Sequence, residues 1–130
     1  MDRADIVFDH VHLISKNPQA AASWYEEKLG GRIVNTSEVG GAPQIVVSFK
    51  GASLIIRGQR EGEQASEKTA LYWGTDHFGF SVNGDFDGFC SDLKNNGVKF
   101  TLDPVDFRPG VRIAFIEAPD SVSIELLQRT

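Results

Sequence analysis

The sequence has few of the features that mark secreted, membrane-spanning or nucleic-acid-binding proteins. A single cysteine, Cys90, excludes a disulfide within the chain, so a reducing compartment, the cytoplasm, is expected. Basic residues are scarce: 13 Lys and Arg stand against 18 Asp and Glu, and the net charge of −5 argues against a nucleic-acid partner. No apolar run approaches the roughly 18 residues of a membrane span, and the N-terminal residues lack the apolar segment of a signal peptide. We therefore expect no membrane partner and a small-molecule substrate.

The remaining composition is that of an ordinary globular domain. The chain has 130 residues, of which 41% are hydrophobic and 24% charged. A chain of this length corresponds to one domain and can bury a core without disulfides. Within it, the polar stretch at residues 58–69 has no apolar periodicity and separates two halves.

The two halves begin with the same dipeptide. Asp9-His10 and Asp76-His77 are 67 positions apart, and each opens a short alternating run that is typical of a strand. A helix-like stretch follows in each half and ends at a glycine, Gly30 or Gly97, 20 residues after the histidine. The shared start and the shared interval indicate an internal duplication.

Each half is predicted to contain a strand, a helix and three further strands. In the first half these are strand 6–15, a helix at 19–29 preceded by Asn17-Pro18 as cap and first residue, and strands 32–39, 44–49 and 53–57. In the second half they are strand 77–82, helix 85–96, and strands 98–102, 112–117 and 121–128. The sequence thus predicts an α+β fold with one domain over residues 1–130. Its two tandem βαβββ units, about 5–58 and 70–130, would form a curved mixed sheet around a metal-binding cleft.

Three side chains at matching places in the repeat are candidate metal ligands. His10 and His77 lie at equivalent strand starts, and Glu125 lies on the last strand, with its apolar neighbours pointing to the other face. An inward Glu125 needs a cation or hydrogen-bond donors, because burying an unpaired carboxylate costs on the order of several kcal/mol. Two imidazoles and one carboxylate around a divalent metal leave coordination positions open, as in non-haem Fe(II) oxygenases. Taken singly, each residue also has a structural or surface interpretation.

Two further polar side chains share the inward faces. His12 lies on the same face as His10 and is a candidate catalytic base, a rival ligand or a partner of a ligand. Arg57 alternates with Ile55, so an inward Arg57 would suit the carboxylate, phosphate or enolate of a substrate. The alternative is that Arg57 ends its strand and reaches solvent.

The motifs together resemble those of the vicinal oxygen chelate superfamily, which includes glyoxalases, extradiol dioxygenases, methylmalonyl-CoA epimerases and antibiotic-resistance proteins. The resemblance covers nearly the whole chain and implies metal ligands at His10, His77 and Glu125. It is carried by Asp9-His10-Val11-His12-Leu13, Trp24-Tyr25-Glu26-Glu27-Lys28-Leu29-Gly30, Asp76-His77-Phe78-Gly79-Phe80, Ala118-Pro119-Asp120 and Ile124-Glu125-Leu126.

Two positions depart from the patterns of particular superfamily members. Glyoxalases and epimerases of the group usually have a fourth ligand, Glu or Gln, where the repeat places Ile55 here. The three remaining ligands resemble the set of the dioxygenases. Ring-cleaving dioxygenases typically carry a Tyr where this chain has Phe115, so Phe115 is assigned to substrate binding and cleavage of a plain catechol is not expected.

The resemblance therefore implies a metal-dependent enzyme, first of all an Fe(II)-type dioxygenase or oxygenase. Its substrate would be small, aromatic or enolisable, and would chelate the metal through vicinal oxygens. Zn, Ni, Co and Mn are alternative metals. A glyoxalase-type lyase or an epimerase is the alternative enzyme, and a non-catalytic binder similar to bleomycin-resistance proteins is the alternative outside catalysis. A homodimer is expected, with the cleft completed within one chain or by exchange of halves between chains.

Overall fold

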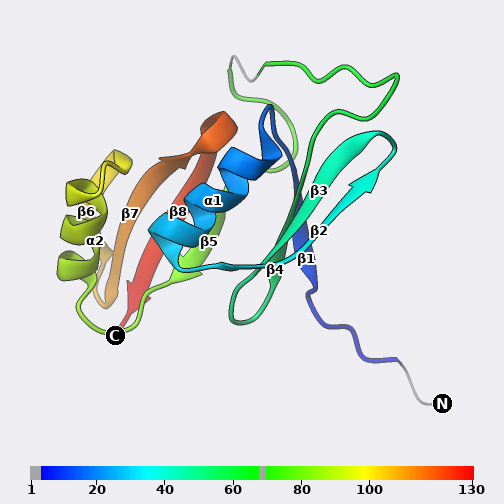
Figure 1. Cartoon of the computed structure of the whole chain (residues 1–130). Helices are drawn as coiled ribbons and strands as arrows, with labels where there is room; N and C mark the ends of the chain where they lie inside the picture. The colour runs from blue at the N-terminus through cyan, green and yellow to red at the C-terminus, as the bar shows by residue number, and fades with distance from the viewer. Residues whose placement is uncertain (1–3, 68–69) are drawn as a thin grey trace. The chain divides into compact units, whose positions relative to one another are not determined.

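The chain folds into two successive units, each with one helix and one four-stranded mixed sheet (Figure 1). A computed structural model describes residues 4–67 and 70–130, and the boundary between the units lies between Ala65 and Ser66. Both units have the element order βαβββ. The predicted α+β fold with tandem βαβββ units is confirmed.

The first unit has the sheet order β1-β4-β3-β2. Strand β1 is parallel to β4, and the other neighbours are antiparallel. Its elements are β1 (His10–Ile14), α1 (Pro18–Leu29), β2 (Arg32–Val39), β3 (Ala42–Ser48) and β4 (Ser53–Arg57).

Helix α1 begins and ends where the sequence predicts. The Asn17 side chain accepts a hydrogen bond from the Ala20 amide at 3.1 Å, and Pro18 occupies the first turn, where no amide hydrogen is needed. Gly30 ends the helix in the left-handed conformation at φ 76°, which glycine adopts without steric cost. The helix packs on β3 and buries Tyr25 among other side chains.

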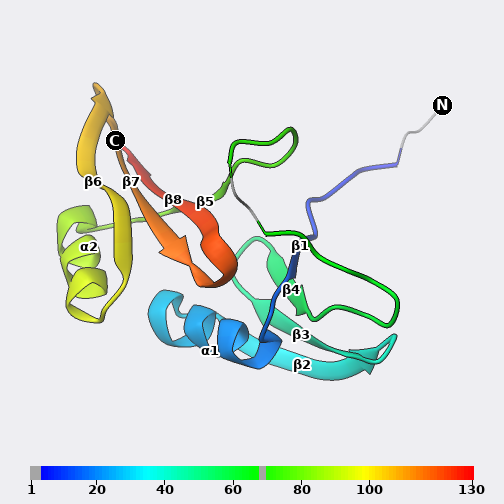
Figure 2. The same ribbon diagram turned by 90° about the horizontal axis from the view of Figure 1, so that it is seen from above.

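The second unit repeats this arrangement with the sheet order β5-β8-β7-β6. Strand β5 is parallel to β8, as β1 is to β4. Figure 2 shows α2 beside β6. The elements are β5 (Phe78–Ser81), α2 (Phe86–Asn95), β6 (Lys99–Arg108), β7 (Val111–Ala118) and β8 (Val122–Arg129), with a short 3-10 turn at Pro119–Ser121.

Each sheet has one fully buried apolar face and one face that is only half-buried. The buried faces are built from Ile45, Val47, Leu54 and Ile56 in the first unit and from Ala114, Ile116, Ile124 and Leu126 in the second. Because side chains alternate along a strand, Arg57 and Ile55 lie on the half-buried face of the first sheet. Phe115, Glu125 and Leu127 lie on the corresponding face of the second.

Two strands differ from their predicted extents by more than two residues at one end. Strand β1 begins at His10 rather than at residue 6, and Ile6, Val7 and Phe8 are exposed, since apolar residues form a strand only where a neighbour pairs with them. Strand β6 continues to Arg108 through several register shifts against β7. Such bulges break the alternation by which a strand is recognised in sequence.

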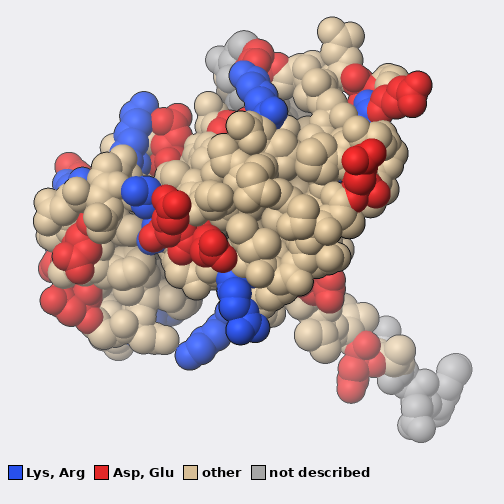
Figure 3. Space-filling view, viewed as in Figure 1, with Lys and Arg blue, Asp and Glu red and all other residues tan. Residues whose placement is uncertain are grey.

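The last features of the fold are the distribution of surface charge and the length of the helices. On the face shown in Figure 3, Lys and Arg side chains are interspersed with Asp and Glu instead of forming a continuous basic patch. In the part of the chain that the structure describes, no helix is long and apolar enough to cross a membrane.

Candidate metal and ligand-binding site

The two repeated Asp-His dipeptides make the same hydrogen bond in their separate units. The Nδ1 atom of His10 lies 2.7 Å from Oδ2 of Asp9, and the Nδ1 atom of His77 lies 2.8 Å from Oδ2 of Asp76. A carboxylate at this position holds the proton on Nδ1 and leaves Nε2 as the nitrogen that can bind a ligand. The duplication therefore preserves an oriented imidazole in each half.

Glu125 faces His77 across the parallel strand pair β5–β8. The Nε2 atom of His77 lies 3.2 Å from Oε1 of Glu125, although 48 positions separate the residues in sequence. Gly79 is the register partner of Glu125, and a Cβ atom there would lie 3.2 Å from the Glu125 carbonyl oxygen and 3.4 Å from its Cβ. The small residue leaves Glu125 room beside β5.

The electrostatics of this pair call for a cation between the two side chains. The hydrogen bond to Asp76 raises the pKa of His77 above its ordinary value, Glu125 adds to this, and partial burial opposes it. With its proton on Nδ1, a neutral His77 would present only a lone pair to the Glu125 carboxylate. A proton or a metal ion at Nε2 removes that repulsion.

The spacing of the two atoms also fits a shared divalent metal. Metal–ligand bonds of about 2.1 Å at right angles would place the two ligand atoms about 3.0 Å apart. The observed separation is 3.2 Å. The side chains of His77 and Glu125 are 31% and 23% exposed, so an ion or a small molecule can reach both of them.

The third sequence-predicted ligand belongs to the first unit. His10 lies on the half-buried face of the first sheet with its ring centroid 5.9 Å from that of His12. Among the described residues, no group of three or more His, Cys, Asp or Glu side chains is gathered so that it could hold a metal. The structure thus brings together His77 and Glu125 and leaves His10 in its own unit.

His12 and Arg57 lie in one polar group on the first sheet. Burial lowers the pKa of His12, and the positive charges of Arg57, His10 and Arg60 lower it further, which favours the neutral imidazole that can accept a proton. Arg57 donates to both oxygens of Glu63, at 2.5 and 3.3 Å, and its side chain is only 13% exposed. It is therefore mostly shielded from solvent, and it already holds a carboxylate.

The register of the strands relates His12 to the position of the missing fourth ligand. His12 pairs with Ile55 in the first unit as Gly79 pairs with Glu125 in the second. Ile55 thus occupies the Glu125-equivalent place, and the first unit has an imidazole where the second has no side chain.

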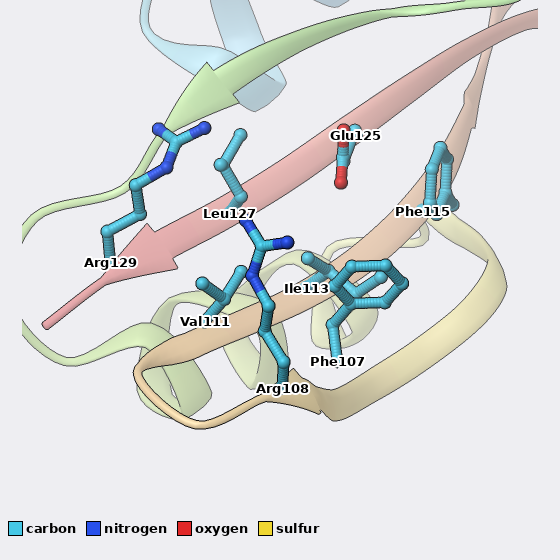
Figure 4. A pocket seen from close by; sticks show the side chains of 8 residues that line it. All are labelled: Phe107, Arg108, Val111, Ile113, Phe115, Glu125, Leu127 and Arg129. Carbon is cyan, nitrogen blue, oxygen red and sulfur yellow. The ribbon is translucent and has the colours of Figure 1, made fainter.

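A cavity of about 320 Å³ lies on the half-buried face of the second sheet (Figure 4). Two of the sequence-predicted residues line it, Glu125 and Phe115. The Phe115 ring stands edge-on to the His77 ring, with centroids 4.9 Å apart. The complete lining is Phe107, Arg108, Val111, Ile113, Phe115, Glu125, Leu127 and Arg129.

Most of this lining lies outside the residues that the sequence predicts for the site. Strand alternation from Glu125 leads to Leu127 and Arg129, and alternation from Phe115 leads to Ile113 and Val111, so four residues were within its reach. The remaining two, Phe107 and Arg108, depend on the bulged path of β6, which sequence periodicity does not reveal.

A model of a known protein family matches most of the chain. The chain fits the model of the Glyoxalase/Bleomycin resistance protein/Dioxygenase superfamily over residues 7–126. No curated protein matches it.

Several solved structures resemble the chain over nearly their full lengths. A glyoxalase/bleomycin resistance protein/dioxygenase domain from Frankia sp. EAN1pec is 21% identical, with a TM-score of 0.81 over 98% of this chain and 100% of that one. A glyoxalase family protein from Bacillus cereus is 14% identical, with a TM-score of 0.81 over 98% and 96%. One from Enterococcus faecalis is 22% identical, with a TM-score of 0.75 over 92% and 95%.

These structural likenesses show a common fold, and the family match extends from before the first Asp-His pair to just beyond Glu125. The chain belongs to the glyoxalase/bleomycin resistance protein/dioxygenase superfamily, the vicinal oxygen chelate superfamily.

Proposed function

We propose that this protein is a divalent-metal-dependent enzyme that uses His10, His77 and Glu125 as its protein ligands. The observation that carries the proposal is the pair of identical Asp-His hydrogen bonds in the two units, one of which aims its Nε2 at Glu125. Carboxylate partners of this kind orient and strengthen histidines as metal ligands.

The proposal requires an imidazole from a first unit beside the His77–Glu125 pair of a second unit. The two units can come from one chain or from two chains of a homodimer that exchange halves. We propose the homodimer as the working assembly, with one metal for each pair of units.

The ligand set favours an Fe(II)-type dioxygenase or oxygenase. Ile55 cannot ligate, so three protein ligands would leave positions open on the metal, and bound Fe(II) would there supply dioxygen chemistry to a substrate that chelates through vicinal oxygens. Zn, Ni, Co or Mn would fit the same donors with different chemistry.

The surrounding side chains would bind and orient the substrate. Phe115 lies beside His77 and lines the cavity, so it would contact an aromatic or enolisable substrate near the metal end. Arg57 would orient an enolate oxygen of the substrate if that oxygen displaced Glu63. The neutral form of His12 would serve as the proton acceptor.

Metal-dependent oxygen consumption tests this function. The protein is loaded anaerobically with Fe(II), and oxygen uptake is measured with larger phenols, quinols and substituted catechols as candidate substrates. We expect turnover with Fe(II) and none with Zn(II), which has no accessible redox change. Undiminished anaerobic turnover with Ni(II), Co(II) or Zn(II) contradicts the oxygenase proposal.

The second candidate is a glyoxalase-type lyase or an epimerase, and it is favoured by one observation. His12 is the strand neighbour of Ile55, so its imidazole adjoins the place where the missing fourth ligand would lie. There it would act as the base, and water would take the place of the missing fourth ligand. The test is anaerobic turnover of thiol adducts of 1,2-dicarbonyls with Ni(II), Co(II) or Zn(II), which His12→Ala should abolish.

A further inference from the structure

Charge is distributed unevenly in the cavity of the second unit. Glu125 is the acidic residue of its lining, and Arg108 and Arg129 are the basic ones. Glu125 and Arg129 are four residues apart on β8, on the same face, so their Cα atoms are about 13 Å apart at the usual rise of an extended strand. The cavity therefore has an acidic end at the proposed metal position and a basic end near the end of the strand.

The two arginines differ from Arg57 and Arg112, whose guanidinium groups are paired with carboxylates. Arg57 is held by Glu63, and Arg112 is held by Asp87 and Asp106. Among the described residues, neither Arg108 nor Arg129 makes an ion pair with a carboxylate. The Arg108 guanidinium lies 5.6 Å from the centre of the Phe107 ring, and Figure 4 shows it directed over the cavity toward Leu127.

The wall between the two ends is apolar. It is formed by Phe107, Val111, Ile113, Phe115 and Leu127. Rings at Phe107 and Phe115 suit an aromatic or similarly flat body, and a volume of about 320 Å³ lies at the low end of the range for small-molecule sites, about 300–1,000 Å³. The space fits a body of a single ring with a short substituent.

The first unit lacks this cavity lining at the equivalent positions. By strand register, Ile113 and Leu127 in the second unit correspond to Gln44 and Arg57 in the first. The first unit fills the face with its own polar contacts, in which Arg60 donates to Gln44 and Arg57 to Glu63. The duplication has therefore diverged, and the apolar wall with free cations belongs to the second unit.

We infer that the substrate is a single-ring compound that carries an oxyanion, carboxylate or phosphate, on a short side chain, and that Arg108 and Arg129 bind this anion. The inference deepens the proposed function and rests on it for the end that chelates the metal. The anion lies at the arginine end because Glu125 repels it from the other. Arginine suits this role because its planar fork donates paired hydrogen bonds to an oxyanion.

The test uses metal-free protein, so that a negative result on anion binding can be told apart from a negative result on metal binding. 3-Phenylpropionate has the ring and the anion but no chelating oxygens, and 3-phenylpropionamide is its neutral counterpart. Binding is measured by NMR titration of the backbone amides of β7 and β8. We expect the acid to bind about tenfold more tightly than the amide, the size expected of a charge-assisted hydrogen bond.

Substitutions then locate the anion. Arg108→Gln and Arg129→Gln should each reduce the acid's affinity several-fold, and the double variant should remove its advantage over the amide. Arg32→Gln, which changes an exposed arginine of β2, should leave both affinities unchanged. Rising salt should weaken binding of the acid and spare the amide, because salt screens exposed charges.

Three results of the comparison between acid and amide would overturn the inference, and a fourth is the absence of any binding by either compound. The first three are equal affinity for acid and amide, an unchanged preference for the acid in the double variant, and loss of that preference in Arg57→Gln instead. Metal content of the wild-type protein, measured separately, decides the metal proposal whichever result is obtained.

Discussion

Removing the carboxylate behind a proposed ligand histidine tests the site without changing any of the proposed ligands. Asp76 Oδ2 lies 2.8 Å from His77 Nδ1, and substitution of such a partner typically weakens metal affinity by about 10- to 100-fold. The Asp76 side chain is 70% exposed, so water can replace part of its effect and the lower end of that range applies. We therefore expect Asp76→Ala to weaken metal binding about tenfold, or about 1.4 kcal/mol.

A graded series separates charge from hydrogen bonding. Asp76→Asn keeps a neutral acceptor for Nδ1–H and should cost less than Asp76→Ala. Asp9→Ala removes the equivalent partner of His10, at 2.7 Å, and should have a similar effect to Asp76→Ala. Asp92→Ala, at an exposed position of α2, is the matched control and should bind metal as the wild type does.

The assay is anaerobic titration with Co(II) against a competing chromogenic chelator, with circular dichroism to confirm that each variant is folded. Affinities of Asp76→Ala and Asp9→Ala equal to that of wild type would refute the reasoning, because neither carboxylate would then orient a ligand. A tenfold loss in Asp92→Ala would show that the effect is general to surface charge.

Three other predictions concern the core, the Arg57–Glu63 ion pair and the proposed base His12. Leu126→Ala should lower the free energy of unfolding by about 2–5 kcal/mol in denaturant titration, because Leu126 is 1% exposed, whereas Leu71→Ala, at 90% exposure, should change it by less than about 0.5 kcal/mol. Arg57→Ala should weaken substrate binding by on the order of 2 kcal/mol and spare metal affinity, as measured by isothermal titration calorimetry. Glu63→Gln should strengthen substrate binding, because it releases Arg57. Stronger binding by Arg57→Ala, or weaker binding by Glu63→Gln, would reject this role of Arg57. His12→Ala should reduce kcat and leave metal content intact, and loss of the metal in this variant would show that His12 is a ligand.

Sequence signals from neighbouring residues predicted the exact bounds of some elements. Strands β2 and β4 have the predicted bounds, Arg32–Val39 and Ser53–Arg57, since alternation and flanking glycines define a strand without help from distant contacts. The caps of α1 at Asn17 and Gly30 were also predicted, because capping is a local interaction.

The site could be predicted only as far as the repeat extends. The repeat placed His10 and His77 at equivalent strand starts and Glu125 on the last strand, and the structure brings the side chains of His77 and Glu125 to 3.2 Å. The hydrogen bonds of Asp9 and Asp76 follow from side-chain rotamers, and the engagement of Arg57 by Glu63 follows from the path of a loop. Neither leaves a periodic signal in the sequence.

The cavity shows the limit most clearly. Its arginine end depends on Arg108, which β6 brings to the cavity only after register shifts against β7. Each shift reverses the face on which later residues lie, so alternation from Lys99 cannot place Arg108. The chemical character of the lining had to be taken from the structure.

The metal content of four proteins tests the central claim most directly. Wild type, His10→Ala, His77→Ala and Glu125→Ala are loaded anaerobically with Fe(II), freed of unbound metal and measured by elemental analysis. We expect one metal per chain in the wild type and its loss in all three variants, since each would remove one of three ligands. Stoichiometric metal retained by folded His77→Ala and Glu125→Ala proteins would contradict it.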